Sequence, residues 1–192
     1  MANHPQFEAL IRRDEILRRT AEIGSEVRAS FGDHGEPLIL CVALGGRVFC
    51  RHLLEHLERG LEVREVRCSS YGVRTESSGE VKIRGLEGLD LRGRDILVVE
   101  DIVDTGYTLS KLSARLEDLG AARVRTATLL SKPSRRVVEI DIEYIGFEVE
   151  NHFVVGFGMD VAERFRDLPY VGVYDERLDP AVAGGTQRSA PA

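Results

Sequence analysis

The feature that most constrains this chain is a short, unbroken run of apolar residues that occurs twice and is followed each time by a helical pattern. The first run spans Leu38 to Leu44, and the second spans Ile96 to Val99. Runs this short, with no polar position, are typical of strands buried on both faces of a parallel sheet. Apolar residues then recur at helical spacing, as at Leu109, Leu112 and Leu116. This alternation predicts a doubly wound α/β sheet.

The rest of the chain extends this pattern. Residues 6–31 carry apolar positions at helical spacing among many charges, which predicts one amphipathic helix with a buried stripe of Phe7, Leu10, Leu17, Ala21 and Val27. Further strands are predicted over 61–71, 124–130 and 144–147. The polar, glycine- and serine-rich stretch 72–84 predicts a mobile loop. We expect a single domain over 1–178 and a frayed, disordered tail over 179–192.

Composition excludes several classes of protein. The chain has 26 Lys and Arg against 32 Asp and Glu, a formal net charge of −6, which argues against a general nucleic-acid binder. Cys41, Cys50 and Cys68 lack metal-ligand spacing, and their odd number argues against a disulfide framework. No run is long enough to span a bilayer. We therefore expect a cytoplasmic protein with neither a nucleic-acid nor a membrane partner.

The segment from Val98 to Leu109 carries the strongest chemical signal. A buried strand ends in the acidic pair Glu100 and Asp101, and a helix begins after the Asp-Thr-Gly triplet of residues 104–106. Ligands of open α/β sheets bind at the carboxyl ends of the strands, and a helix start offers free N–H groups to an anion. The order of these features favours a phosphate site over a chance arrangement in which Asp104 only starts the helix.

The same residues suit a sugar phosphate and a cation. Gly106 permits close backbone approach, and the hydroxyls of Thr105 and Thr108 can donate to phosphate oxygens. The adjacent carboxylates Glu100 and Asp101 repel each other unless they meet hydroxyl groups or a hard cation, and ribose and Mg²⁺ would supply both. Neither a P-loop nor a G-x-G-x-x-G fingerprint occurs in the sequence.

This run resembles the phosphoribosyl-pyrophosphate (PRPP) signature of the type I phosphoribosyltransferases, and the whole chain is similar to the hypoxanthine-guanine branch of that family. The segments that carry the resemblance span most of residues 37–174 and include Leu44-Gly45-Gly46, Ser69-Ser70-Tyr71-Gly72, Leu130 to Arg136, Tyr144 to Phe147, Phe153 to Asp160 and Arg164 to Tyr170. The resemblance implies a twisted, mostly parallel sheet flanked by helices. It also implies a small hood formed by the N-terminal segment and residues 145–178.

By this resemblance the protein is a pentosyltransferase of purine salvage. It would move 5-phosphoribosyl from PRPP to hypoxanthine or guanine in the presence of Mg²⁺, giving IMP or GMP and pyrophosphate. Relatives are dimers or tetramers, so a homodimer or homotetramer is expected. A xanthine- or guanine-selective transferase and a ligand-sensing regulatory protein on the same fold stay open as alternatives.

The resemblance also assigns roles to residues. Asp104 matches the general base, and the site positions fall into five groups. The 5′-phosphate and ribose would contact Glu100, Asp101, Asp104, Thr105, Gly106, Tyr107 and Thr108. Pyrophosphate would contact Leu44, Gly45, Gly46 and Arg166. The purine would contact Lys132, Phe153, Val154 and Asp160, and the metal would be held by Glu100, Asp101 and Asp160. Ser70 and Tyr71 would begin a loop that closes over the site.

Several of these residues could instead have a purely structural role. Lys132 could be a solvated loop lysine, although its ammonium can donate to a purine O6 and has no acceptor for the amine of adenine. Phe153 could be strand core, Tyr71 could be a packing residue at a strand end, and Asp160 with Arg166 could form a surface ion pair. The sequence also departs from the family pattern. Leu44 stands where many relatives carry lysine, which is tolerable if the loop backbone holds pyrophosphate, and Tyr107 occupies an often polar or basic position.

Overall fold

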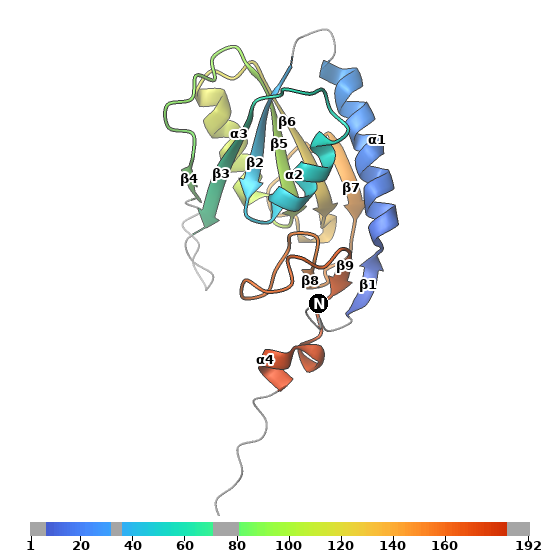
Figure 1. The fold of residues 1–192 in the computed structure, drawn as a ribbon. Helices are drawn as coiled ribbons and strands as arrows, with labels where there is room; N and C mark the ends of the chain where they lie inside the picture. The colour runs from blue at the N-terminus through green and yellow to red at the C-terminus, as the bar shows by residue number, and fades with distance from the viewer. Residues whose placement is uncertain (1–6, 32–35, 71–80, 184–192) are drawn as a thin grey trace, which may run out of the picture.

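The computed structural model describes residues 7–31, 36–70 and 81–183. Its centre is a six-stranded sheet with strand order β4-β3-β2-β5-β6-β7 (Figure 1). The strands are β2 (Leu38–Ala43), β3 (Val63–Ser70), β4 (Val81–Arg84), β5 (Asp95–Val103), β6 (Arg123–Ser131) and β7 (Tyr144–Glu148). Neighbouring strands run parallel except for β3 and β4, which are antiparallel. The predicted mostly parallel α/β sheet is confirmed.

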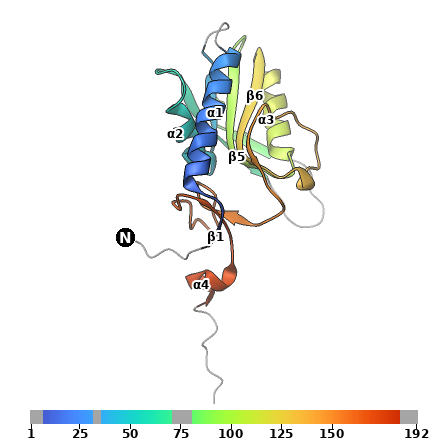
Figure 2. The ribbon, with the colours of Figure 1, turned by 90° about the vertical axis from the view of Figure 1, so that its right-hand side faces the viewer.

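Helices cover both faces of this sheet (Figure 2). α1 (Arg13–Phe31) and α2 (Gly46–Leu54) pack on one face with Ile39 and Leu97. α3 (Tyr107–Asp118) packs on the other face with Leu38 and Ile96. Because successive strand residues point to opposite faces, each apolar run supplies both cores, which explains why it contains no polar position.

A second, smaller sheet forms the hood beneath the carboxyl ends of the main strands (Figure 1). It is antiparallel with order β1-β9-β8, from β1 (Glu8–Ile11), β8 (Val154–Val155) and β9 (Val171–Val173). The prediction of one helix over 6–31 was therefore wrong at its start, because residues 8–11 pair with β9 and the helix begins at Arg13. Phe7 packs in the hood core instead of on a helical stripe.

Two further expectations are corrected. Residues 81–84, expected in a mobile loop, form β4 against β3, and Ile83 packs on the core beneath α3. Residues 71–80 of that expected loop lie outside the described residues. The start of the expected frayed tail is ordered too, because Asp179 is fully buried and precedes the short helix α4 (Pro180–Ala183). The buried carboxylate of Asp179 is stabilised by an ion pair with Arg164. The composition of the tail does not reveal this pairing.

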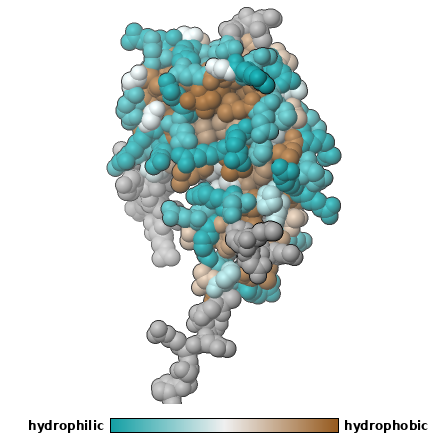
Figure 3. All heavy atoms as spheres, in the orientation of Figure 1, coloured by the Kyte–Doolittle hydropathy of each residue, from teal (hydrophilic) through white to brown (hydrophobic). Residues whose placement is uncertain are grey.

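The surface shown in Figure 3 is mostly hydrophilic, with apolar side chains gathered in its upper half.

α1, the longest helix, buries only one stripe, formed by Ile16, Thr20, Ile23, Gly24, Val27 and Phe31. Within the described part of the chain, no helix is long and apolar enough to cross a membrane.

Candidate active site

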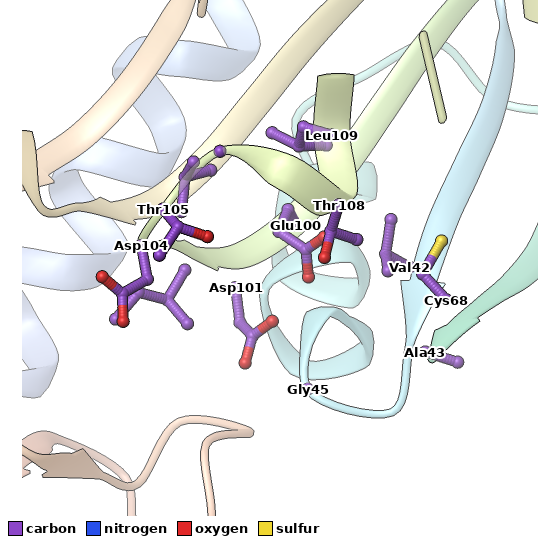
Figure 4. A pocket seen from close by; sticks show the side chains of 13 residues that line it. Val42, Ala43, Gly45, Cys68, Glu100, Asp101, Asp104, Thr105, Thr108 and Leu109 are labelled. Atoms are coloured by element: carbon purple, nitrogen blue, oxygen red, sulfur yellow. The ribbon is translucent and has the colours of Figure 1, made fainter. Parts of the chain in front are cut away.

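A cavity of about 240 Å³ opens at the carboxyl ends of β2, β3 and β5, where α3 begins (Figure 4). It is lined by Val42, Ala43, Gly45, Cys68, Glu100, Asp101, Ile102, Val103, Asp104, Thr105, Gly106, Thr108 and Leu109. The side chains of Asp101 and Asp104 extend from the end of β5 and line the cavity. The structure thus gathers the acidic pair, the Asp-Thr-Gly triplet and Thr108 around one cavity. Cys68 was missed, although its place near the end of a neighbouring strand could have indicated it.

The turn between β5 and α3 has a geometry that requires glycine. Gly106 has φ of 89°, in the left-handed region, and a Cβ at this position would lie 2.8 Å from the carbonyl oxygen of Val138. Gly106 is the N-cap residue and no side chain caps the helix. The alternative in which Asp104 only starts the helix therefore does not describe this turn. The first turn of α3 therefore faces the cavity with the unpaired backbone N–H groups that helix starts provide.

Asp104 has a partner that the sequence did not indicate. The Nε atom of Arg135 lies 3.1 Å from Oδ1 of Asp104, and both side chains are nearly half exposed. The same segment holds the turn through its backbone, because the N–H groups of Val137 and Val138 both donate to the carbonyl oxygen of Thr105 at 3.0 and 3.1 Å. The chain after β6 thus fixes the turn that carries Asp104.

The acidic pair is in an environment that favours a cation. Glu100 is 8% exposed, and its burial together with the charge of Asp101 raises its pKa well above the usual range. Burial also raises the pKa of Asp101, against the opposing effect of Arg166. Among the residues described, no three His, Cys, Asp or Glu side chains form a ready metal cluster. Asp160 therefore does not join Glu100 and Asp101 in a preformed site, and a cation would need oxygens from substrate and water.

The loop after β2 passes directly beside Asp101. The peptide bond between Ala43 and Leu44 is cis, and the Leu44 side chain is 40% exposed. A hood loop approaches from the other side, because a Cβ on Gly158 would lie 2.1 Å from the carbonyl oxygen of Gly45. Ala43 and Gly45 of the loop after β2 line the cavity, whereas Leu44 and Gly46 are not among the lining residues.

The residues expected to contact the purine are not among those that line the cavity. Lys132, at the end of β6, is 7% exposed, and its Nζ donates to the carbonyl oxygen of His152 at 2.7 Å. Burial lowers the pKa of Lys132, while the charge of Asp104 acts in the opposite direction. Phe153 is 58% exposed, whereas Val154 is buried in β8. The solvated-lysine and strand-core alternatives therefore do not describe Lys132 and Phe153.

Asp160 and Arg166 contact each other, with 2.6 Å between Oδ1 and Nη2. Nη1 of Arg166 also donates to the carbonyl oxygen of Gly158 at 2.7 Å. The ion pair that the sequence offered as an alternative role for Asp160 and Arg166 is thus present. It lies next to Gly158, which approaches the loop after β2. Ser70 is the last residue of β3, and Tyr71, the other closing-loop residue, lies outside the described residues.

Three features together define the phosphoribosyltransferase class. These are an acidic strand end, a turn suited to phosphate at the carboxyl edge of a parallel sheet, and a hood that faces this edge. A model of the phosphoribosyl transferase domain matches residues 8–162, and the chain belongs to this family.

Particular relatives narrow the comparison. The chain is 43% identical to hypoxanthine-guanine phosphoribosyltransferase of Bacillus subtilis over 184 residues, covering 95% of this chain and 98% of that protein. It is 40% identical to the protein of the same name from Streptococcus thermophilus over 169 residues, 88% of this chain and 93% of the other. A crystal structure of a hypoxanthine-guanine phosphoribosyltransferase from Bacillus anthracis matches with a TM-score of 0.82 and 31% identity, covering 88% and 100% of the two chains.

Proposed function

We propose that the protein transfers the 5-phosphoribosyl group of PRPP to a 6-oxopurine, hypoxanthine or guanine, as an enzyme of purine salvage. The observation that carries this proposal is the cavity at the end of β5, where acidic residues and a phosphate-type turn lie together. The names of the relatives support the choice of substrates. We propose a cytoplasmic homodimer or homotetramer, as expected for the family.

The turn at residues 105–108 would hold the 5′-phosphate through N–H groups and threonine hydroxyls. Glu100 and Asp101 would meet the ribose hydroxyls and a hydrated Mg²⁺, which would neutralise charge on the leaving pyrophosphate. Their raised pKa values fit this role, because two buried carboxylates without a cation are poorly stabilised in their charged forms.

Asp104 would act as the general base. As the bond from ribose C1 to pyrophosphate oxygen breaks, its electron pair leaves with pyrophosphate, and a purine nitrogen bonds to C1. The proton on the purine then passes to the carboxylate of Asp104. Arg135 would hold this carboxylate at the edge of the cavity through the 3.1 Å contact.

The choice of base would depend on Lys132, Phe153 and Val154. The ammonium of Lys132 would donate to O6 of the purine, the exposed ring of Phe153 would stack on it, and backbone groups of Val154 would read its edge. Asp160 would contact the purine site and help Glu100 and Asp101 to hold the metal. Pyrophosphate would bind the backbone at residues 44–46 and the guanidinium of Arg166, whose planar fork suits phosphate oxygens.

A screen of bases tests this proposal against its alternatives. The protein is incubated with PRPP, Mg²⁺ and hypoxanthine, guanine, xanthine or adenine, and nucleotide formation is measured. We expect IMP and GMP, and no product from adenine. Product from xanthine alone would show the xanthine-selective enzyme. No product with any 6-oxopurine, together with PRPP binding, would favour the ligand-sensing protein.

A further inference from the structure

The most deeply buried carboxylate of the hood lies outside the cavity and belongs to the segment expected to be frayed. Asp179 is 0% exposed, and both of its oxygens pair with the guanidinium of Arg164, with 2.6 Å between Nη2 and Oδ2. It also accepts from the hydroxyl of Tyr174 at 2.6 Å and from the N–H of Ala181 at 3.0 Å. A buried charge with this many partners fixes the position of each of them.

One of these partners reaches the proposed purine site. Tyr174 follows β9 and faces Phe153 across the hood sheet, with its N–H donating to the carbonyl oxygen of Phe153 at 2.8 Å. The two rings pack edge to face with centroids 5.5 Å apart. Phe153 is 58% exposed, and its recorded ring partner in the described part of the chain is Tyr174. The Asp179 carboxylate thus holds the ring that holds Phe153.

The other partner reaches the proposed pyrophosphate site. Arg164 lies two residues before Arg166, in the loop that begins at Asp160, and its backbone pairs with Val161. Ala162, Glu163 and Phe165 in this loop have positive φ values of 48°, 63° and 73°. Residues with side chains disfavour this region, so the loop needs support from outside itself. The paired guanidinium of Arg164 gives it that support.

We propose that Asp179 is a positioning residue that acts from outside the cavity. It fixes both the ring of Phe153, which would stack on the purine, and the loop that carries Arg166, which would contact pyrophosphate. This inference rests on the proposed function. It adds the C-terminal segment to the machinery of the reaction, with one link to each substrate. Tyr174→Phe and Arg164→Gln address one link each, because Tyr174→Phe keeps the ring that also packs against Phe165 of the loop.

Steady-state kinetics of four variants test the proposal. Tyr174→Phe removes the hydroxyl and keeps the ring, and we expect it to raise the KM for the purine several-fold and leave the KM for PRPP unchanged. Arg164→Gln should raise the KM for PRPP and pyrophosphate, with partial rescue by Arg164→Lys, which keeps the charge without the planar fork. Asp179→Asn should raise both KM values, with a smaller effect on kcat.

The matched control is Asp175→Asn. Asp175 lies in the same segment and pairs with Arg177, whose side chain is exposed, with 2.7 Å between Nη2 and Oδ2. It should leave both KM values at the wild-type level. Assays are run well below the unfolding temperature of each variant, which is measured separately.

The outcomes separate two failures. No turnover by the wild type with any 6-oxopurine would overturn the proposed function, and this inference with it. An active wild type whose KM values are unchanged in Tyr174→Phe, Arg164→Gln and Asp179→Asn would overturn this inference alone, even if unfolding temperatures fall. Equal rises of both KM values in Tyr174→Phe and Arg164→Gln would contradict the separate links.

Discussion

Lys132 determines the base in this account, because it is a buried donor at the end of β6 beside the cavity. Lys132→Ala should raise the KM for hypoxanthine and guanine by roughly ten- to a hundredfold, the effect of losing one charge-assisted hydrogen bond of about 1.5–3 kcal/mol. The KM for PRPP should change much less. Lys111→Ala on the exposed face of α3 is the control. An equal loss toward both substrates would remove Lys132 from the purine site.

In this account, Glu100 reduces the stability of the metal-free protein. Its burial beside Asp101 raises its pKa, so its charge is unfavourable in the folded, metal-free protein. Glu100→Gln should raise Tm without Mg²⁺ by a few degrees, equivalent to about 1 kcal/mol for a chain of this size, and should lower activity. Thermal unfolding and turnover measure the two effects. A lower Tm with full activity would show that the charge is not part of the site.

At the scale of elements, the turn between β5 and α3 depends on Gly106. Gly106→Ala adds a methyl group 2.8 Å from the carbonyl oxygen of Val138 in a left-handed conformation, and we expect weaker PRPP binding and lower stability. Gly60→Ala is the matched control, since Gly60 has φ of 92° and nothing within 4 Å of its Cβ position. PRPP affinity by calorimetry checks this. Equal effects of the two substitutions would mean that only backbone strain matters.

The C-terminal segment gives a pH prediction. The ion pair between Asp179 and Arg164 lowers the pKa of the Asp179 carboxylate to about 2, below the value of about 3.9 in an unfolded chain. The stabilisation from this carboxylate is complete above pH of about 4 and is lost as pH falls toward 2. Asp179→Asn should therefore lower Tm at pH 6, and the difference from wild type should shrink across that window. A difference that stays constant down to pH 2 would contradict the ion pair.

Local periodicity was enough to predict the parallel strands of the main sheet, because strands buried on both faces and helices with one buried face leave clear patterns. β1 was mistaken for helix because its apolar residues continue the spacing of α1. Its strand conformation depends on β9, more than 150 residues further along, which no local pattern contains. β4 was expected to be a loop for a different reason, because this short edge strand of alternating apolar and charged residues directly follows a polar stretch.

At the scale of the whole molecule, the cavity was predictable where its residues are consecutive. Residues 100–108 carry the acidic pair and the turn within one strand-to-helix connection, so sequence order alone placed them together. Contacts between distant segments were not predictable. The pairing of Arg135 with Asp104 and the approach of Gly158 to Gly45 arise only when the hood and the chain after β6 fold over the strand ends.

Asp104 provides the most direct test of the central claim, that this cavity joins PRPP and a purine by chemistry at the end of β5. Asp104→Asn and wild type are compared in IMP formation from hypoxanthine and in PRPP binding. We expect kcat to fall by about 10²–10⁴-fold, the usual contribution of a general base, while the dissociation constant of PRPP changes little. Turnover at the wild-type rate in Asp104→Asn would contradict the account.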